Sequence, residues 1–191
     1  MMSTNPKQIE KALAAIKSSP FYITPNYKVD FDTRRLHDNL YAYNVSAEQA
    51  SLGLEETIAH MTPLFQRDNN KWTQEQQIRF VENLLSGCRS EITLFTVKKS
   101  MDDCGILDGL QRVTSVSDFI LGKFPIFDDV YFEQVAIPNV FINGRLSIRI
   151  YEFPSLRKAV EFYISMNEGI THSPEDIQRA RDFLATLPED E

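Results

Sequence analysis

Residues 106–114 read Ile-Leu-Asp-Gly-Leu-Gln-Arg-Val-Thr, and this stretch, the central turn, decides the fold. An apolar pair runs into Asp108-Gly109, and an amphipathic segment then continues to Gly122. Glycine tolerates backbone angles that other residues avoid, so the pattern predicts a strand that ends at this point and a helix that begins directly after it. A helix N-terminus leaves backbone N–H groups unpaired, which suits an anion.

Composition sets the bounds of the fold. The chain has 191 residues, of which 42% are hydrophobic and 25% are charged, as expected for one globular domain. The net charge of −7 argues against a protein that coats nucleic acid. The two cysteines, Cys88 and Cys104, lie far apart without companion ligands, which argues against zinc. We find no secretory or membrane-spanning apolar run, and therefore expect a cytoplasmic protein.

The predicted elements alternate between helices and short strands. Capping signatures at Thr73-Gln76, at Ser155 and at Ser173-Pro174 each predict the start of a helix. Further helices are expected at 4–18, 47–60 and 112–121. Extended segments or strands are expected at 21–32, 40–45, 92–97 and 105–107. A loop with a short strand should follow at 124–135, and a hairpin at 139–150 around Asn143-Gly144.

This order favours a mixed α+β domain over a doubly wound sheet. We divide the chain into an N-terminal helix and extension at 1–50, a principal domain at 51–187 and an acidic tail at 188–191.

Three segments, in order, resemble one known family. They are Phe65-Gln66-Arg67-Asp68 leading through Trp72 into a helix, the central turn, and Phe162–Gly169 with its Phe-x-x-x-x-Asn-x-Gly spacing. The central turn is similar to the Asp-Gly-Gln-Gln-Arg-Leu-Thr hallmark of the domain-of-unknown-function 262 family. This family comprises the N-terminal domains of GmrSD-type modification-dependent restriction enzymes, within the ParB/sulfiredoxin-like fold group. The resemblance covers roughly residues 52–184.

The resemblance implies a site that binds and hydrolyses a nucleoside triphosphate. It assigns catalytic roles to Asp108, Gln111 and Arg112, and nucleotide-binding roles to Gln66, Arg67, Gly109, Thr114 and Asn167. Such roles are chemically reasonable, because phosphoryl transfer depends on positioning and charge stabilisation. An arginine grips phosphate oxygens bidentately. Asp108 suits Mg²⁺, the expected cofactor, or orients the attacking water.

Several alternatives stay open at this stage. Gln111 positions water or reads the base, Thr114 contacts phosphate or a metal-bound water or only caps the helix, and Asn167 with Gly169 also suits a helix C-cap. Leu110 replaces the first glutamine of the hallmark. If that position faces the site, hydrolysis is weakened or lost while binding survives; if it faces the core, leucine is harmless.

The chain lacks the histidine arrangement of the HNH-type nuclease domain that follows in the large restriction enzymes. Its histidines, His37, His60 and His172, are scattered, although His172 lies beside the Asn167–Gly169 segment. Cutting of DNA by this chain alone is therefore not expected.

Three functions remain as hypotheses. The first is a Mg²⁺-dependent NTPase in DNA restriction, defence or phage counter-defence. The second is a non-catalytic module that senses a nucleotide or nucleic acid and regulates a partner nuclease, in an assembly that could include copies of this chain. The third is a DNA-binding regulator with a basic face at Arg145, Arg149, Arg157 and Lys158, against which the overall acidity counts.

Overall fold

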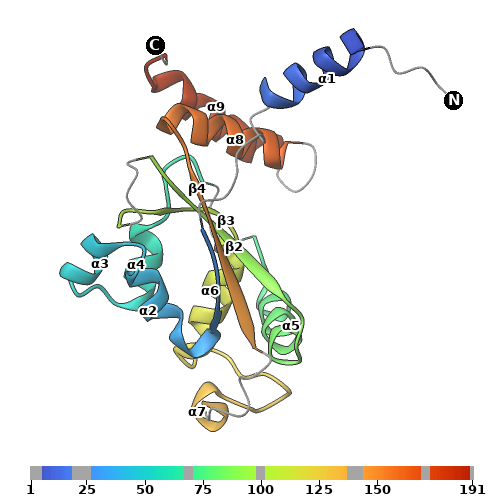
Figure 1. The fold of residues 1–191 in the computed structure, drawn as a ribbon. Helices are drawn as coiled ribbons and strands as arrows, with labels where there is room; N and C mark the ends of the chain where they lie inside the picture. Colours follow the sequence, from blue (N-terminus) through green and yellow to red (C-terminus); the bar gives the residue numbers. More distant parts are fainter. Residues whose placement is uncertain are drawn as a thin grey trace, which may run out of the picture.

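A computed structural model describes residues 6–18, 27–66, 71–97, 102–136, 144–168 and 173–189. The elements are α1 (Pro6–Ser18), β1 (Tyr27–Asp32), a 3₁₀ turn (Thr33–Arg35), α2 (Leu36–Tyr41), α3 (Val45–Gln49), α4 (Leu54–His60), α5 (Gln74–Leu85), β2 (Ser90–Thr96), β3 (Gly105–Asp108), α6 (Leu110–Ile120), α7 (Phe132–Val135), β4 (Arg145–Glu152), α8 (Leu156–Asn167) and α9 (Pro174–Thr186) (Figure 1). The fold is mixed α+β, as the sequence predicts.

Within the described residues, the strands form one mixed sheet in the order β1-β4-β2-β3. The last strand in the chain, β4, is central: it pairs antiparallel with β1 and parallel with β2, and β2 pairs antiparallel with β3. The sheet therefore joins segments that lie far apart in the sequence.

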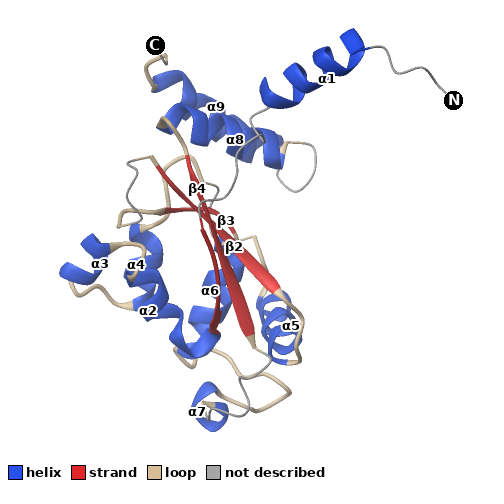
Figure 2. Ribbon diagram, in the orientation of Figure 1, coloured by secondary structure: helices blue, strands red, loops and turns tan. Residues whose placement is uncertain are grey.

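Helices lie around the strands of the sheet (Figure 2), and two apolar clusters hold them against it. The larger one packs α2, α4, α5 and α6 against the strands, with Ile92, Ile106 and Ile148 fully buried on the sheet side. The second packs α8 and α9 against Phe65, Phe95 and Phe153 at one end of the sheet. The central turn lies between the clusters, since Ile106 belongs to the first and Leu107 to the second.

The predicted helix starts are confirmed by their caps. Thr73 Oγ1 accepts from the backbone N–H of Gln76, and the Gln76 side chain accepts from the N–H of Thr73. Ser155 caps α8 by accepting from the backbone N–H of Lys158, and Ser173 caps α9 by accepting from that of Asp176, with Pro174 at the first helical position. These side chains satisfy N–H groups that a helix terminus leaves unpaired.

Three local predictions are wrong. The strand expected at 40–45 is the end of α2 and the start of α3, because Leu36 and Leu40 are buried at helical spacing and Asn44 caps α3. The helix expected at 47–60 is two helices, α3 and α4, separated by residues 50–53. The short strand expected within 124–135 is instead an isolated bridge between Ile126 and Val130, followed by α7.

The hairpin predicted at 139–150 is described only in part. Its first half and Asn143 lie outside the described residues, and its second half is β4. Both edges of β4 are paired, one with β1 and the other with β2.

Helix α1 lies apart from the sheet in Figure 1, and side chains 11–17 along it are exposed. Residues 27–50 belong to the main body: Phe31, Leu36 and Leu40 are buried in the same cluster as Ile92 and Ile148. In the described part of the chain, no helix has the length and apolar character needed to cross a membrane.

Candidate functional site

The central turn has the predicted geometry, and Gly109 is required there for two reasons. Its φ of +94° lies in the left-handed region that side chains disfavour. A Cβ at this position would also lie 2.8 Å from Cγ2 and 3.2 Å from Cα of Ile92. Gly109 therefore lets α6 begin directly against β2, which fixes the direction of every side chain in the first turn of α6.

Asp108 and Arg112 form an ion pair with each other. Nη2 of Arg112 donates to Oδ2 of Asp108 at 2.6 Å, and Nη1 of Arg112 donates to the backbone carbonyl of Glu91. Each of the paired side chains is about one-third exposed, at 29% for Arg112 and 33% for Asp108. The Asp108–Arg112 pair thus ties the start of α6 to the end of β3 and to the start of β2.

Gln66 is a buried clamp between motif segments. Its Nε2 donates to the carbonyls of Ile106 and Leu107, at 3.2 Å each, and its Oε1 accepts from the hydroxyl of Tyr163 at 2.9 Å. One amide therefore joins the segment after α4 to β3 and α8. The three segments that carry the family resemblance do meet in space, although Arg67 itself lies outside the described residues.

The other two predicted amides are also engaged within the protein. Oε1 of Gln111 accepts from the backbone N–H of Trp72 at 3.0 Å, and the ring of Trp72 packs on Phe80 with centroids 5.3 Å apart. Asn167 is buried at the end of α8, where its Nδ2 donates to the carbonyl of Tyr163. These contacts order the site's surroundings and leave ligand contact to other side chains.

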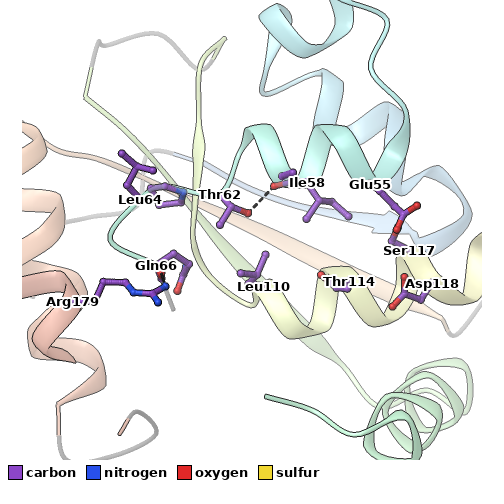
Figure 3. A pocket seen from close by; sticks show the side chains of 12 residues that line it. Glu55, Ile58, Thr62, Leu64, Gln66, Leu110, Thr114, Ser117, Asp118 and Arg179 are labelled. Carbon is purple, nitrogen blue, oxygen red and sulfur yellow. Dashed lines mark hydrogen bonds between the residues drawn. The ribbon is translucent and has the colours of Figure 1, made fainter. Parts of the chain in front are cut away.

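A cavity of about 430 Å³ lies between α4 and α6, with α9 at one end (Figure 3). We call it the α4–α6 cavity. It is lined by Glu55, Ile58, Ala59, Thr62, Pro63, Leu64, Gln66, Leu110, Thr114, Ser117, Asp118 and Arg179. Its volume falls in the range of small-molecule sites, which are concave and largely apolar with a few placed polar groups.

Helix α6 divides the predicted site residues into two groups. Leu110, Thr114 and Ser117 share the side of α6 that lines the cavity, as their spacing of three and four residues requires. Arg112 leaves the helix on another side and pairs with Asp108, and neither residue lines the cavity. Of the predicted residues, Gln66 and Thr114 line it, and so does Leu110, the position at which the chain departs from the family hallmark.

The two ends of the cavity differ in charge (Figure 3). At one end, Nη1 of Arg179 donates to the backbone carbonyl of Gln66 at 3.2 Å. At the other end lie Glu55 and Asp118, with Lys123 bonded to both carboxylates. The hydrogen bonds from Lys123 to Asp118 and Glu55 raise the pKa of Lys123 above its ordinary value, so this bridge between α4 and α6 stays charged at neutral pH.

The arrangement at Asp108 does not suit the Mg²⁺ expected there. Oδ2 of this carboxylate is held by a guanidinium, whose positive charge opposes a divalent cation at the same oxygen. In the part of the chain that the structure describes, no group of three or more His, Cys, Asp or Glu side chains is placed to hold a metal. We therefore derive no metal-dependent step from this site.

The other sequence candidates have structural partners. Nε2 of His37 lies 3.1 Å from the Leu52 carbonyl, and Nε2 of His60 lies 3.0 Å from the Ser46 hydroxyl, while His172 is outside the described residues.

The four cations of the candidate basic face are likewise engaged. Arg145 donates to the carbonyl of Asp30, and Arg149 pairs with Glu91. On α8, Arg157 donates to carbonyls near the end of α9, and Lys158 pairs with Glu161. These contacts argue against a ready-made DNA interface.

Sequence reasoning missed Ser117, Asp118 and Arg179 as cavity residues. Ser117 and Asp118 follow Thr114 at helical spacing, so the side of α6 that bears Thr114 was a usable signal. No comparable signal marks Arg179, which contacts Gln66 across 113 residues of sequence.

Comparison with family models, with curated proteins and with solved structures gives no match to this chain.

Proposed function

We propose that this protein binds a nucleoside phosphate in the α4–α6 cavity and acts as a non-catalytic sensing module. The observation that carries the proposal is that the residues of the central turn lie on two different sides of α6. Leu110 and Thr114 line a cavity of ligand size together with Gln66 and Arg179, whereas Asp108 and Arg112 pair with each other outside it.

The cavity chemistry suits an amphipathic anion. The Arg179 guanidinium offers several N–H donors in a planar fork that matches phosphate oxygens. Ile58, Leu64 and Leu110 provide an apolar wall against which a base or ribose packs. A nucleotide with its phosphates toward Arg179 uses both features, and its base then lies toward Glu55 and Asp118.

Binding is better supported than hydrolysis. Leu110 is 5% exposed and packs in the same apolar cluster as Ile92, and it lines the cavity with an aliphatic side chain where the family hallmark has a glutamine amide. Hydrolysis requires a positioned water and charge stabilisation at the phosphate, and a leucine supplies neither. Asp108 and Arg112, the groups best suited to that chemistry, stabilise each other instead. The competing proposal, a Mg²⁺-dependent NTPase, would require this pair to open and turn toward the ligand.

The setting of the protein is proposed from the resemblance alone. A ParB/sulfiredoxin-like fold, a cytoplasmic location in a bacterial cell, and a role in DNA restriction, defence or phage counter-defence beside a partner nuclease all follow from the family. The meeting of the three motif segments at Gln66 supports the resemblance.

Calorimetric titration with ATP, GTP, CTP and UTP tests the binding proposal. We expect saturable binding of at least one nucleotide, weakened roughly tenfold or more by Arg179→Ala, because a charge-assisted hydrogen bond contributes about 1.5–3 kcal/mol. Arg181→Ala is the matched control, since Arg181 is on the same helix but pairs with Glu168 and does not line the cavity. Equal affinity in the wild type and Arg179→Ala would remove the cavity from consideration.

Phosphate release with Mg²⁺ separates sensor from enzyme. We expect release by the wild-type protein to be no faster than by Asp108→Ala or Arg112→Ala. Release by the wild type that both substitutions abolish would establish an NTPase and would move the site to the Asp108–Arg112 pair.

A further inference from the structure

The hydroxyl of Ser117 lies in an unusual environment for a helical serine. The residue is 1% exposed, and its Oγ is the one buried side-chain oxygen or nitrogen that lacks a hydrogen-bond partner among the described residues. Two residues earlier on the same helix, Ser115 is equally buried but donates to the carbonyl of Gln111 at 2.7 Å. A buried hydroxyl without a partner costs free energy, and a bound molecule that hydrogen-bonds to it would remove that cost.

Ser117 lines the α4–α6 cavity at the end opposite Arg179 (Figure 3). Asp118 lies beside it with its side chain 14% exposed, and Lys123 donates to Oδ1 of Asp118 at 2.8 Å. Glu55, bonded to the same lysine, lines the facing side on α4. The cavity thus ends in a hydroxyl flanked by two carboxylates.

Carboxylates at neutral pH only accept hydrogen bonds, whereas a hydroxyl both donates and accepts. The end therefore offers mainly acceptors and favours a ligand edge that presents N–H donors. A carbonyl oxygen placed there would meet two carboxylates whose combined charge the one cation of Lys123 only half neutralises.

We propose that Ser117 and Asp118 read the exocyclic amino group of a nucleobase. This inference rests on the proposed nucleotide binding and adds a selectivity to it. Cytosine and adenine present an amino group on their pairing edge, whereas uracil and thymine present a carbonyl oxygen at the corresponding position. The site accepts the amino bases and discriminates against uracil.

CTP and UTP are the sharpest pair of probes, because they differ only in the amino or carbonyl group at C4 and the protonation of the adjacent ring nitrogen. We expect the wild-type protein to bind CTP roughly tenfold more tightly than UTP in calorimetric titration, as one hydrogen bond within a shielded site would give. Ser117→Ala and Asp118→Asn should each reduce this ratio, the latter because an asparagine amide also donates to a carbonyl.

Ser115→Ala is the matched control and should leave the ratio unchanged. Thermal denaturation without ligand provides a readout independent of binding: Ser117→Ala should melt at the same or a higher temperature than the wild type, because it removes a hydroxyl that has no partner. Ser115→Ala should melt lower, because its hydroxyl is bonded.

The outcomes distinguish base reading by Ser117 and Asp118 from nucleotide binding in the cavity. Equal affinities for CTP and UTP, or a ratio that Ser117→Ala leaves intact, would overturn base reading while leaving nucleotide binding in place. Failure of the wild type to bind any nucleotide would overturn both.

Discussion

Helix α6 presents two different kinds of chemistry on two of its sides. Toward α4, Leu110, Thr114 and Ser117 line a cavity that ends in an unpartnered buried hydroxyl. Elsewhere on the same helix, Arg112 closes on Asp108 and on the carbonyl of Glu91. The side that bears Arg112 therefore has its charge paired within the protein. A side chain that is suited to catalysis contributes to structure when its partners come from its own fold, so the cavity side is the better candidate for ligand contact.

The largest expected effect comes from disturbing the turn that positions both sides. Gly109→Ala forces a Cβ to 2.8 Å from Ile92 Cγ2 at a φ of +94°. Backbone strain and overpacking each cost about 1–3 kcal/mol, so we expect a loss of about 2–4 kcal/mol in the free energy of unfolding by urea. Gly122→Ala is the control, because its φ is also positive but its Cβ meets nothing within 4 Å. Equal losses in the two variants would show that contact with Ile92 is unimportant.

The next largest effect is expected from removing the Gln66 side chain, whose hydrogen bonds join the cavity to β3. Gln66→Ala leaves the carbonyls of Ile106 and Leu107 and the hydroxyl of Tyr163 without this partner, and should cost about 2–3 kcal/mol of stability. Gln74→Ala, at an exposed position at the start of α5, should change stability by less than about 0.5 kcal/mol. Denaturant midpoints measure both. A mild Gln66→Ala phenotype would mean that the motif segments are held together mainly by their apolar contacts.

Substitutions on the two sides of α6 should have opposite effects, one on stability and the other on nucleotide affinity. Arg112→Ala should lower stability by about 1 kcal/mol through the lost, partly exposed ion pair, and should leave nucleotide affinity unchanged. Thr114→Val, which keeps the side-chain shape, should lower affinity several-fold. Titration and urea unfolding of both variants give the two readouts. A larger affinity loss for Arg112→Ala than for Thr114→Val would reverse the assignment.

The smallest effect concerns Glu91, whose carbonyl accepts from Arg112. Burial would raise the pKa of the Glu91 carboxyl, but hydrogen bonds from Arg149 and Lys28 outweigh it and lower that pKa below its ordinary value. A depressed carboxyl pKa stabilises the fold above the unfolded-state pKa, and this contribution is lost as pH falls through the folded-state pKa.

Urea unfolding between pH 7 and pH 3 should therefore show a larger loss of stability on acidification for the wild type than for Glu91→Gln, with the difference developing below about pH 5. Parallel pH profiles for the two proteins would show that the sheet-surface ion pairs contribute little.

Much of the fold could be predicted from local chemistry. The caps at Thr73, Ser155 and Ser173 fix three helix starts, because a hydroxyl that satisfies an N–H three residues away needs no distant partner. The central turn could be predicted in the same way, because a glycine between an apolar run and an amphipathic run favours a strand that ends there and a helix that begins directly after it. The α+β class follows from these elements.

The errors arise where local pattern and long-range packing compete. A short strand was expected at residues 40–45, where the sequence pattern is ambiguous, yet burial of Leu36 and Leu40 on one side of α2 decides for a helix. The partners of β4 are likewise remote in sequence, because it pairs with β1 on one edge and with β2 on the other.

The site was predictable only in part. The motifs led to Gln66 and Thr114, which line the cavity, and to Asp108 and Arg112, which do not. Whether Leu110 faces a cavity or a core depends on where α4 packs, and sequence alone left that open. The lack of a partner for Ser117 is a property of the assembled fold and has no counterpart in any sequence pattern.

The central position of β4 has a consequence for how this protein emerges from the ribosome. Strands β1 and β2 do not pair with each other, and the hydroxyl of Thr33, directly after β1, reaches its partner Gly144 across 111 residues. The four-stranded sheet therefore cannot be completed until the strand that begins at Arg145 has been synthesised, and until then β1 and one edge of β2 lack their strand partner. Completion of the sheet consequently waits for the synthesis of β4, and nascent chains truncated before β4 are expected to need chaperone protection.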